Sequence, residues 1–297
     1  MTIEVPADVT EAVLAAMERT SDPRLRAIMT SLVRHLHAFI VEVGLTEDEF
    51  RAGTTLINEL GQRSNDSHNE TVLMAGSLGI SALVCMLNNS ERNEQRTSQS
   101  LLGPFWRLHS PRIENGDSIV RSPVGGATMF VRGQLIDRQG NAVNNAEVDV
   151  WQCSPAGLYE NQDSAQMPMN LRGKLTTDSE GRFWFRSVKP IGYPIPTDGV
   201  VGRLLAAQQR HPFRPAHVHV LASKPGFRTL IAQLYLPDDP KLETDAQFGV
   251  RRDLIGHLEQ HSERHPDDDS VQAPWFTLEH TFHMERGASK LPAPPIK

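Results

Sequence analysis

The sequence predicts an α+β protein, with a helical N-terminal part followed by an antiparallel β-sandwich. Up to about residue 95 the apolar residues recur at helical spacings, and no heptad or internal repeat is sustained. From Ala127 onward, short runs rich in Val, Ile, Phe and Trp are separated by Gly, Pro and Asn. The chain of 297 residues is long enough for one large or two smaller domains. We expect a helical domain over residues 1–100 and a sandwich domain over residues 101–297.

The most regular helix is predicted from Asp22 to Val43. Ser21 or Asp22 is suited to cap its start, and Gly44 is suited to end it. Apolar residues follow at spacings of three and four, which places them on one face: Leu25, Ile28, Leu32, Leu36 and Ile40. The pattern predicts an amphipathic helix.

Three further segments have helical character. Thr46 and Glu49 form a capping-box pattern, so a helix is expected to begin there. Residues Val72 to Leu87 are apolar almost all round, which predicts one helix buried between partners. Because such a surface needs covering, this helix favours a homodimer. A short helix is expected within LETDAQFGVRRDLIGHLEQH, residues 242–261.

Several strands are predicted from β-branched and aromatic runs bounded by turn signals. In EVDVW, Val148 and Val150 alternate with polar residues and Trp151, as in a half-buried strand. The other predicted strands are ATMFVRGQLID, GRFWFRSV, HVHVLA and TLIAQLYL. Many short strands with frequent turns indicate a sandwich.

Charge and composition exclude some classes of partner. A net charge of −6 and a pI of about 6.1 argue against nucleic acid, which requires a basic surface. No apolar run reaches the roughly 18 residues needed to span a bilayer, so no membrane insertion is expected. The acidic first residues do not resemble a secretory signal. The two cysteines, Cys85 and Cys153, suggest no disulfide framework, so we expect a reducing, cytoplasmic location.

The pair His217-Val218-His219 is a candidate metal site, because residues two apart in a strand point to the same face. The alternative to a metal site is that one of these two histidines lies in the core and the other on the surface. An iron(II) triad would need a carboxylate, and no acidic residue follows closely. A zinc hydrolase would need a third ligand, for which His211 and His109 are available without a regular spacing.

Tyrosine is another class of candidate ligand. The chain has three tyrosines, Tyr159, Tyr193 and Tyr235, and the prolines around Tyr193 stiffen its backbone. A phenolate is a hard, anionic donor suited to iron(III). Composition alone does not assign these residues, and a buried tyrosine with one hydrogen bond is the commoner interpretation.

Longer motifs indicate a family. They are WQCSPAGLYENQD, LRGKLTTDSEGRFWF, VKPIGYPIPTDGVVGRLL, RHPFRPAHVHVLASKPGFRTLIAQLY and, near residues 101–106, LLGPFW. Together with the helical N-terminal part, they resemble the intradiol ring-cleaving dioxygenases over nearly the full chain. The chain looks most similar to the hydroxyquinol 1,2-dioxygenase branch, with catechol 1,2-dioxygenases as the next relatives.

The resemblance implies an Fe(III) site and a reaction. Its four ligands fall on Tyr159, Tyr193, His217 and His219, with Tyr193 and His219 axial. Arg214 matches an arginine that stabilises negative charge, Gln233 matches a glutamine beside the ligands, and Tyr193 would also act as a base. The implied enzyme uses O2 to open hydroxyquinol or a related catechol between its hydroxylated carbons. The products would be maleylacetate or cis,cis-muconate-type diacids, formed in aromatic degradation.

The resemblance also implies a substrate pocket and partners. Its lining falls on Ala82, Cys85, Leu101, Pro104, Phe105, Pro194, Ile195, Phe248, Gly249 and Val250. The hydroxyquinol branch usually has an acidic residue where this chain has Leu83-Val84-Cys85, so substrate preference is open. Relatives form homodimers through the helical part and hold a phospholipid there. An iron-free ligand carrier that kept the pocket is the alternative from another class.

Overall fold

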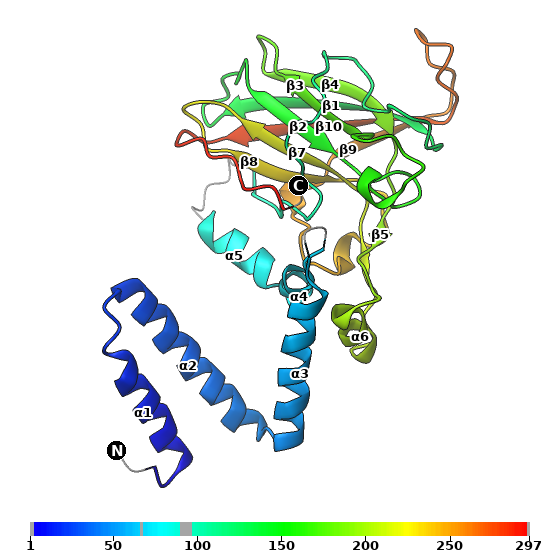
Figure 1. Cartoon of the computed structure of the whole chain (residues 1–297). Helices are drawn as coiled ribbons and strands as arrows, with labels where there is room; N and C mark the ends of the chain where they lie inside the picture. The colour runs from blue at the N-terminus through cyan, green and yellow to red at the C-terminus, as the bar shows by residue number, and fades with distance from the viewer. Residues whose placement is uncertain (1–2, 66–67, 90–96, 296–297) are drawn as a thin grey trace. The chain divides into compact units, whose positions relative to one another are not determined.

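The computed structural model describes residues 3–65, 68–89 and 97–295. The chain forms two compact units, Met1–Glu59 and Leu60–Lys297, which are described separately below. Figure 1 shows the helices of the first unit and the sheets of the second. The helices α4 and α5, which the sequence assigned to the N-terminal domain, belong to the second compact unit. The domain boundary at residues 100 and 101 stays a prediction.

The first unit is helical, as expected. Its elements are α1 (Pro6–Met17), α2 (Pro23–Val43) and most of α3 (Glu47–Arg63). The Asp22 carboxylate caps α2 by accepting bonds from the backbone amides of Arg24 and Leu25, and Gly44 ends it at a φ of 60°. Both ends of this predicted helix are therefore confirmed, with Asp22 as the cap.

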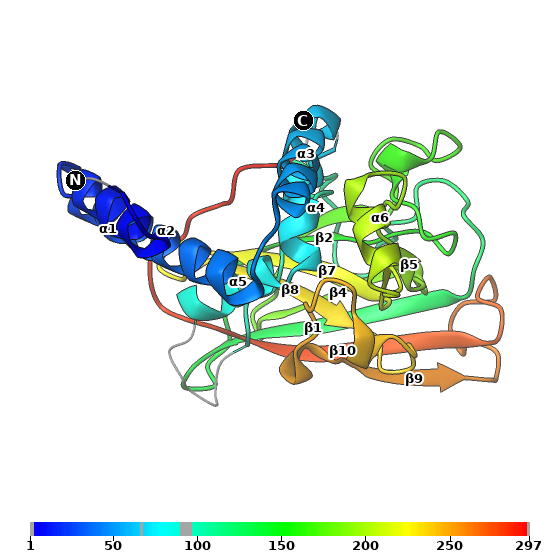
Figure 2. The ribbon, with the colours of Figure 1, turned by 90° about the horizontal axis from the view of Figure 1, so that it is seen from below.

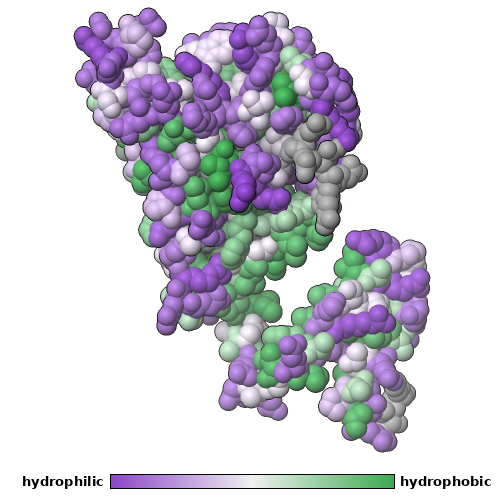
Figure 3. Space-filling model, turned by 180° about the vertical axis from the view of Figure 1, so that it is seen from behind, coloured by the Kyte–Doolittle hydropathy of each residue, from purple (hydrophilic) through white to green (hydrophobic). Residues whose placement is uncertain are grey.

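The capping box at the start of α3 is also confirmed. The Thr46 amide donates to the Glu49 carboxylate at 2.9 Å, and the Glu49 amide donates to the Thr46 hydroxyl at 3.3 Å. The apolar face of α2 remains about half exposed within this chain, and apolar atoms are visible on the helical unit in Figure 3.

The expected single helix over residues 72–87 is wrong. The structure has two helices there, α4 (Glu70–Ser77) and α5 (Ile80–Asn88), bent by 76° at the break. Gly79 takes a φ of 73° between them, a left-handed conformation that glycine adopts without the penalty of a Cβ. No single described helix is long and apolar enough to cross a membrane; only α4 and α5 taken together pass that test by length and composition.

Two four-stranded sheets form the second unit, which confirms the predicted fold class. One has the order β4-β1-β10-β9 and the other β3-β2-β7-β8. Figure 2 shows β10 between β1 and β9. The strands are β1 (Thr128–Asp137), β2 (Glu147–Trp151), β3 (Arg172–Thr176), β4 (Arg182–Val188), β7 (His217–Ser223), β8 (Leu230–Tyr235), β9 (His257–His261) and β10 (Trp275–Met284). Pairing is antiparallel except between β1 and β10, which run parallel.

The remaining elements are short. A third sheet pairs β5 (Tyr193–Pro194) with β6 (Phe213–Arg214), and α6 (Val200–Ala207) lies between them in the chain. The 3-10 turn η1 spans Glu160–Gln162. The expected helix over residues 242–261 is wrong, because the segment contains only the single turns η2 (Leu242–Thr244) and η3 (Arg252–Leu254), followed by β9. Among its polar residues, Asp245 is buried.

The main core lies between the two large sheets. Val218, Val220 and Ala222 of β7 belong to it, as do Val148 and Val150 of β2. The alternate residues of β7 do not face this core, so its opposite face is available for polar side chains.

The prediction that Glu147–Trp151 is half-buried is wrong. Asp149 and Trp151, on the opposite face from the valines, are also buried. A second apolar cluster covers that face, made of Trp106, Trp151, Cys153, Tyr159, Tyr193 and Leu221. We refer to it below as the outer cluster.

Gly133 of β1 offers a test of packing between strands. It pairs with Phe183 of β4, and a Cβ at Gly133 would lie 2.1 Å from the ring of Phe183. Gly133→Ala is therefore expected to lower the free energy of unfolding by about 1–3 kcal/mol, measured by urea denaturation. Gly53→Ala is the control, because nothing lies near that position of α3 and alanine favours helix. Equal stability of the two variants would contradict this packing.

Candidate active site

The two predicted histidine ligands lie on one face of β7. His217 pairs with Tyr235 and His219 with Gln233 of β8, while Trp151 of β2 pairs with His219 on the other side. Because β7 lies between two neighbours, its backbone is held on both edges. The Trp151 ring also stacks on His219 at 4.5 Å with an interplanar angle of 6°.

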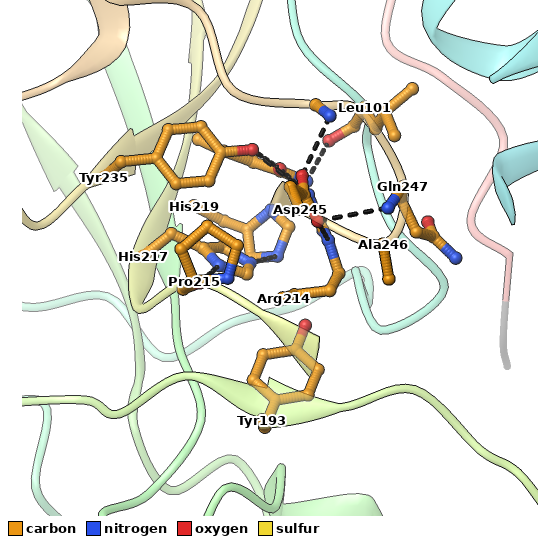
Figure 4. Close-up of polar contacts among 12 residues, drawn as sticks. Leu101, Tyr193, Arg214, Pro215, His217, His219, Tyr235, Asp245, Ala246 and Gln247 are labelled. Carbon is orange, nitrogen blue, oxygen red and sulfur yellow. Dashed lines mark hydrogen bonds and ion pairs between the residues drawn. The ribbon is translucent and has the colours of Figure 1, made fainter. Parts of the chain in front are cut away.

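Four donor atoms converge at this face. The Nε2 atoms of His217 and His219 are 3.2 Å apart. The Tyr159 hydroxyl lies 3.2 Å from His219 Nε2 and 3.3 Å from the Tyr193 hydroxyl. Figure 4 shows the Tyr193 hydroxyl pointing toward the histidine pair. The structure thus brings together all four residues expected to be ligands, from the loop after β2, from β5 and from β7.

Hydrogen bonding sets the tautomer of His217. Its Nδ1 atom is 2.7 Å from the Pro215 carbonyl oxygen, which can only accept, so Nδ1 carries the proton and Nε2 has a free lone pair. His219 Nδ1 is buried and has no partner among the described residues. Burial, and then the positive charge of Arg214, lowers the pKa of His217 to about 3. Burial also lowers the pKa of His219, so both imidazoles are neutral, the form that binds metals.

The two tyrosines are held as neutral phenols unless a cation is present. Burial, and then the nearby Tyr193, raises the pKa of Tyr159 well above its ordinary value. Burial raises the pKa of Tyr193 to about 12, against the opposing charge of Arg214. A buried multivalent cation would reverse this preference, because a nearby positive charge favours the phenolate.

The donor set fits a metal ion with four protein ligands. Two donors that are each about 2.0–2.1 Å from one ion lie about 3.3–3.4 Å apart at a tetrahedral angle. The observed separations of 3.2–3.3 Å are close to this value. Among the described residues, no group of three or more His, Cys, Asp or Glu side chains is placed to hold a metal. The carboxylate of an iron(II) triad and the third ligand of a zinc site are therefore not found beside the pair.

Arg214 is buried, not a surface cation. Its Nε donates to Asp245 Oδ1 at 3.1 Å, and its Nη2 lies 3.1 Å from Asp245 Oδ2 and 2.8 Å from Gln233 Oε1. Tyr235 adds a hydroxyl that lies 3.1 Å from Nη2 and donates to Gln233 at 2.6 Å. Figure 4 shows Arg214, Asp245 and Tyr235 beside the histidine pair. The predicted Arg214 and Gln233 therefore belong to one hydrogen-bonded network beside the donors.

The segment from Leu101 to Trp106 covers the site. The Leu101 carbonyl accepts a bond from Gln233 at 2.7 Å, and the Phe105 ring lies 4.4 Å from that of Tyr159. Gly103 approaches His219 so closely that a Cβ there would be 3.1 Å from the ring. Leu101 and Phe105 thus lie beside the donor cluster.

The segment Phe248–Val250 lies on the side of Arg214. A Cβ on Gly249 would lie 2.8 Å from Arg214 Nη2, and the Phe248 ring lies against Gly79 at the start of α5. Phe248 and Val250 line a cavity of about 490 Å³ that also reaches Asp245. None of the four donor residues lines this cavity.

The other pocket candidates have diverse surroundings. Ile195 is buried, whereas Pro104 and Pro194 are exposed. The Cys85 thiol in α5 lies 3.7 Å from the Ser100 carbonyl oxygen, next to Leu101. The roles of Ala82, Cys85, Pro104, Pro194 and Ile195 in a pocket stay predictions.

Several residues of the site were given no role from the sequence. Tyr235 was named with the other two tyrosines but not placed beside Arg214, although it follows Gln233 by two in the same predicted strand. Asp245 carries no such signal, since it lies in the irregular segment that was expected to be helical. Glu160 follows Tyr159 directly and pairs with buried Arg172, whose Nη1 donates to the Phe105 carbonyl at 2.6 Å.

Comparison with known proteins identifies the family. The chain matches the family described as Dioxygenase over residues 109–284 and the one described as Catechol dioxygenase N terminus over residues 22–96. A hydroxyquinol 1,2-dioxygenase of Rhizobium sp. is 38% identical, covering 93% of this chain and 94% of the relative. A catechol 1,2-dioxygenase of Candida albicans is also 38% identical, covering 94% of this chain and 92% of the relative.

Solved structures agree with the sequence relatives. The hydroxyquinol 1,2-dioxygenase from Pseudomonas putida DLL-E4 superposes with a TM-score of 0.88 at 35% identity, covering 95% of this chain and 99% of that one. This protein belongs to the intradiol ring-cleavage dioxygenases. It is an oxidoreductase that cleaves aromatic rings with O2, and the resemblance inferred from its motifs is confirmed.

The contribution of Glu160, which follows Tyr159, to the stability of the site can be tested by mutation. Glu160 accepts bonds from Arg172 Nε at 2.8 Å and Arg107 Nη1 at 3.0 Å. Glu160→Ala would leave the buried Arg172 without its counter-charge, so we expect the free energy of unfolding to fall by about 3–5 kcal/mol in chemical denaturation. Glu147→Ala, which removes a more exposed carboxylate from two ion pairs, should cost about 0–1 kcal/mol. Similar losses in both variants would refute the supporting role of Glu160.

Proposed function

We propose that this protein is an Fe(III)-dependent intradiol dioxygenase that opens hydroxyquinol or a related catechol between the two hydroxylated carbons. The observation that carries the proposal is the convergence of two neutral imidazoles and two phenols, whose donor atoms form a chain of three contacts at 3.2–3.3 Å. The ligands would be Tyr159, Tyr193, His217 and His219. Two phenolates offer hard negative charge, which favours iron(III) over softer or less charged ions.

The substrate class is supported by the relatives. Those named hydroxyquinol 1,2-dioxygenase and catechol 1,2-dioxygenase match this chain at the same 38% identity, so identity does not separate the two substrates. The proposed products are maleylacetate from hydroxyquinol and cis,cis-muconate-type diacids from catechols.

Iron(III), when bound, would supply Lewis acidity at the diol oxygens. The chain's own residues would supply proton transfer and charge. Tyr193 Oη is suited to take a proton from the diol, because it lies within the donor cluster, 3.3 Å from the Tyr159 hydroxyl, where the diol oxygens would meet the ion. Its position in the two-residue strand β5, paired with Arg214 and Phe213 of β6, restrains it near the histidines.

Arg214 would stabilise negative charge that develops on the substrate. Its side chain is 4% exposed, and a positive charge in such a low-dielectric setting acts more strongly than in water. The outer cluster helps by keeping bulk water from the donor side of β7.

Substrate preference is proposed to depend on Cys85. Its thiol faces the Ser100 carbonyl and the Asn89 amide, and its pKa is raised by burial against the opposing charge of Arg251. A thiol is a weaker hydrogen-bond partner than the carboxylate usual in the hydroxyquinol branch. A pocket without a strong polar partner discriminates poorly between ring substituents, so we expect turnover of several diols.

The proposal extends to assembly and location. The half-exposed apolar face of α2, together with exposed Leu83 and Val84 of α5, supports a homodimer whose second copy covers apolar surface. We also propose a phospholipid bound at the helical part, as the family resemblance implies. A cytoplasmic location is proposed from the cysteine content. Both cysteines are free thiols.

The decisive test is oxygen uptake by purified, iron-containing protein with hydroxyquinol, catechol and substituted catechols, corrected for autoxidation. We expect one O2 consumed for each ring-opened diacid identified by mass. The fastest substrate would reveal the effect of Cys85. No uptake with any diol from an iron-containing preparation would refute the substrate class, and a colourless protein that binds diols without iron would indicate a carrier.

Tyr193→Phe tests the proposed ligand and base. The variant removes one oxygen from a buried ring, so the fold should persist while iron content and ring cleavage fall strongly. Iron is measured by metal analysis and the fold by circular dichroism. Tyr235→Phe removes the same atom from another buried ring, outside the donor cluster, and it should retain iron. Full activity of Tyr193→Phe would contradict the base role.

A further inference from the structure

The buried Arg214 guanidinium is bound along one edge. Asp245 contacts both Nε and Nη2 at 3.1 Å, and Nη2 also contacts Gln233 at 2.8 Å and the Tyr235 hydroxyl at 3.1 Å. The Nη1 group takes part in none of these bonds. The guanidinium is planar, so fixing the Nε and Nη2 edge also fixes the direction of the Nη1 donors.

Asp245 is itself held by the backbone that follows it. Its Oδ1 accepts from the Gln247 amide at 3.1 Å, and its Oδ2 accepts from the Gly249 amide at 2.8 Å. Each carboxylate oxygen therefore bonds one backbone amide and one nitrogen of Arg214. The Asp245 side chain is 2% exposed, and a charge buried so deeply is stable only when it is paired and hydrogen-bonded.

The turn after Asp245 requires glycine at position 249. A Cβ there would lie 2.8 Å from Arg214 Nη2, 2.9 Å from the Tyr235 hydroxyl and 3.2 Å from Asp245 Oδ2. Gly249, which the sequence suggested as a substrate contact, thus packs directly on the ion pair. Its missing side chain lets the pair close.

We infer that Asp245 is the positioning residue for Arg214, holding the Nε and Nη2 edge so that the Nη1 donors are left for the substrate. This inference rests on the proposed function, because it takes Arg214 as the group that meets negative charge on the reacting diol. A flexible arginine side chain would lose conformational entropy each time it ordered around the substrate. Because Asp245 already holds the side chain in one conformation, this entropy is not lost when the substrate binds.

The network also connects Arg214 to the segment that covers the site. Gln233 accepts from Arg214 through Oε1 and donates from Nε2 to the Leu101 carbonyl at 2.7 Å. A displacement of Arg214 would therefore remove one of the bonds that orient Gln233. Loss of Asp245 is expected to affect the chemical step more than the binding of iron, since Asp245 bonds none of the four donors.

The test starts from wild-type protein with demonstrated ring cleavage, so that failure of the proposed function is recognised first. Asp245→Asn should lower kcat by about 10- to 100-fold through misplacement of Arg214, with a smaller change in KM. Its iron content and visible absorption band should match wild type. Asp137→Asn is the matched control, because Asp137 is equally buried and also accepts bonds from backbone amides, but at the end of β1. Wild-type kcat in Asp245→Asn would overturn the inference.

Two further variants separate positioning from general damage. If Asp245 acts through Arg214, adding Asp245→Asn to Arg214→Met should cause little further loss of kcat, because the partner is already absent. Losses that multiply in the double variant would overturn the inference. Gly249→Ala removes no polar group, but its added methyl group should displace Arg214. The variant should therefore also have a lower kcat while it retains iron. If Asp245→Asn does not fold, Gly249→Ala is the variant that tests whether Arg214 must be held in position. Unchanged kcat in Gly249→Ala would count against the inference.

Discussion

The site depends on burying β7 on both faces. A strand alternates its side chains with a period of two, so Val218 and Val220 enter the sandwich core while His217 and His219 turn the other way. In an ordinary sandwich strand the second face meets water. Here the outer cluster covers it, and this removes both imidazoles from solvent. Their neutrality and the high pKa values of the tyrosines both follow from that burial.

Two buried ion pairs lie beside the four neutral donors, and within each pair the two charges balance one another. Arg214 with Asp245 lies on the side of β8, and Glu160 with Arg172 lies beside Tyr159. Burial alone would lower the pKa of Arg214, but the Asp245 carboxylate raises it well above its ordinary value. Although burial opposes ionisation of Asp245, Arg214 holds the pKa of that carboxyl below its usual range. Each pair keeps its charges because the partner is in direct contact.

The hydrogen-bond networks around these two pairs also bind the segment Leu101–Trp106 that covers the site. Arg172 donates to the Phe105 carbonyl, and Gln233 donates to the Leu101 carbonyl. The covering segment has no regular secondary structure between these residues, so side chains from the sheet satisfy its backbone. The same bonds that support the four donors therefore shape one wall of the expected substrate pocket.

The sequence determined the elements whose signal is local. The helix from Pro23 to Val43, its end at Gly44 and the capping box at Thr46 depend on neighbouring residues and were predicted correctly, whereas the cap was left open between Ser21 and Asp22. The long motifs identified the family, and the i, i+2 spacing placed His217 and His219 on one face. Only tertiary structure decided the rest. The apolar run divides at Gly79, where the Phe248 ring from a distant turn lies against the glycine. The strand Glu147–Trp151 is buried on both faces because residues distant in sequence, such as Trp106, cover its second face. Asp245 meets Arg214 across 31 positions of sequence, a contact that no spacing rule reveals because it is made by turns in an irregular segment.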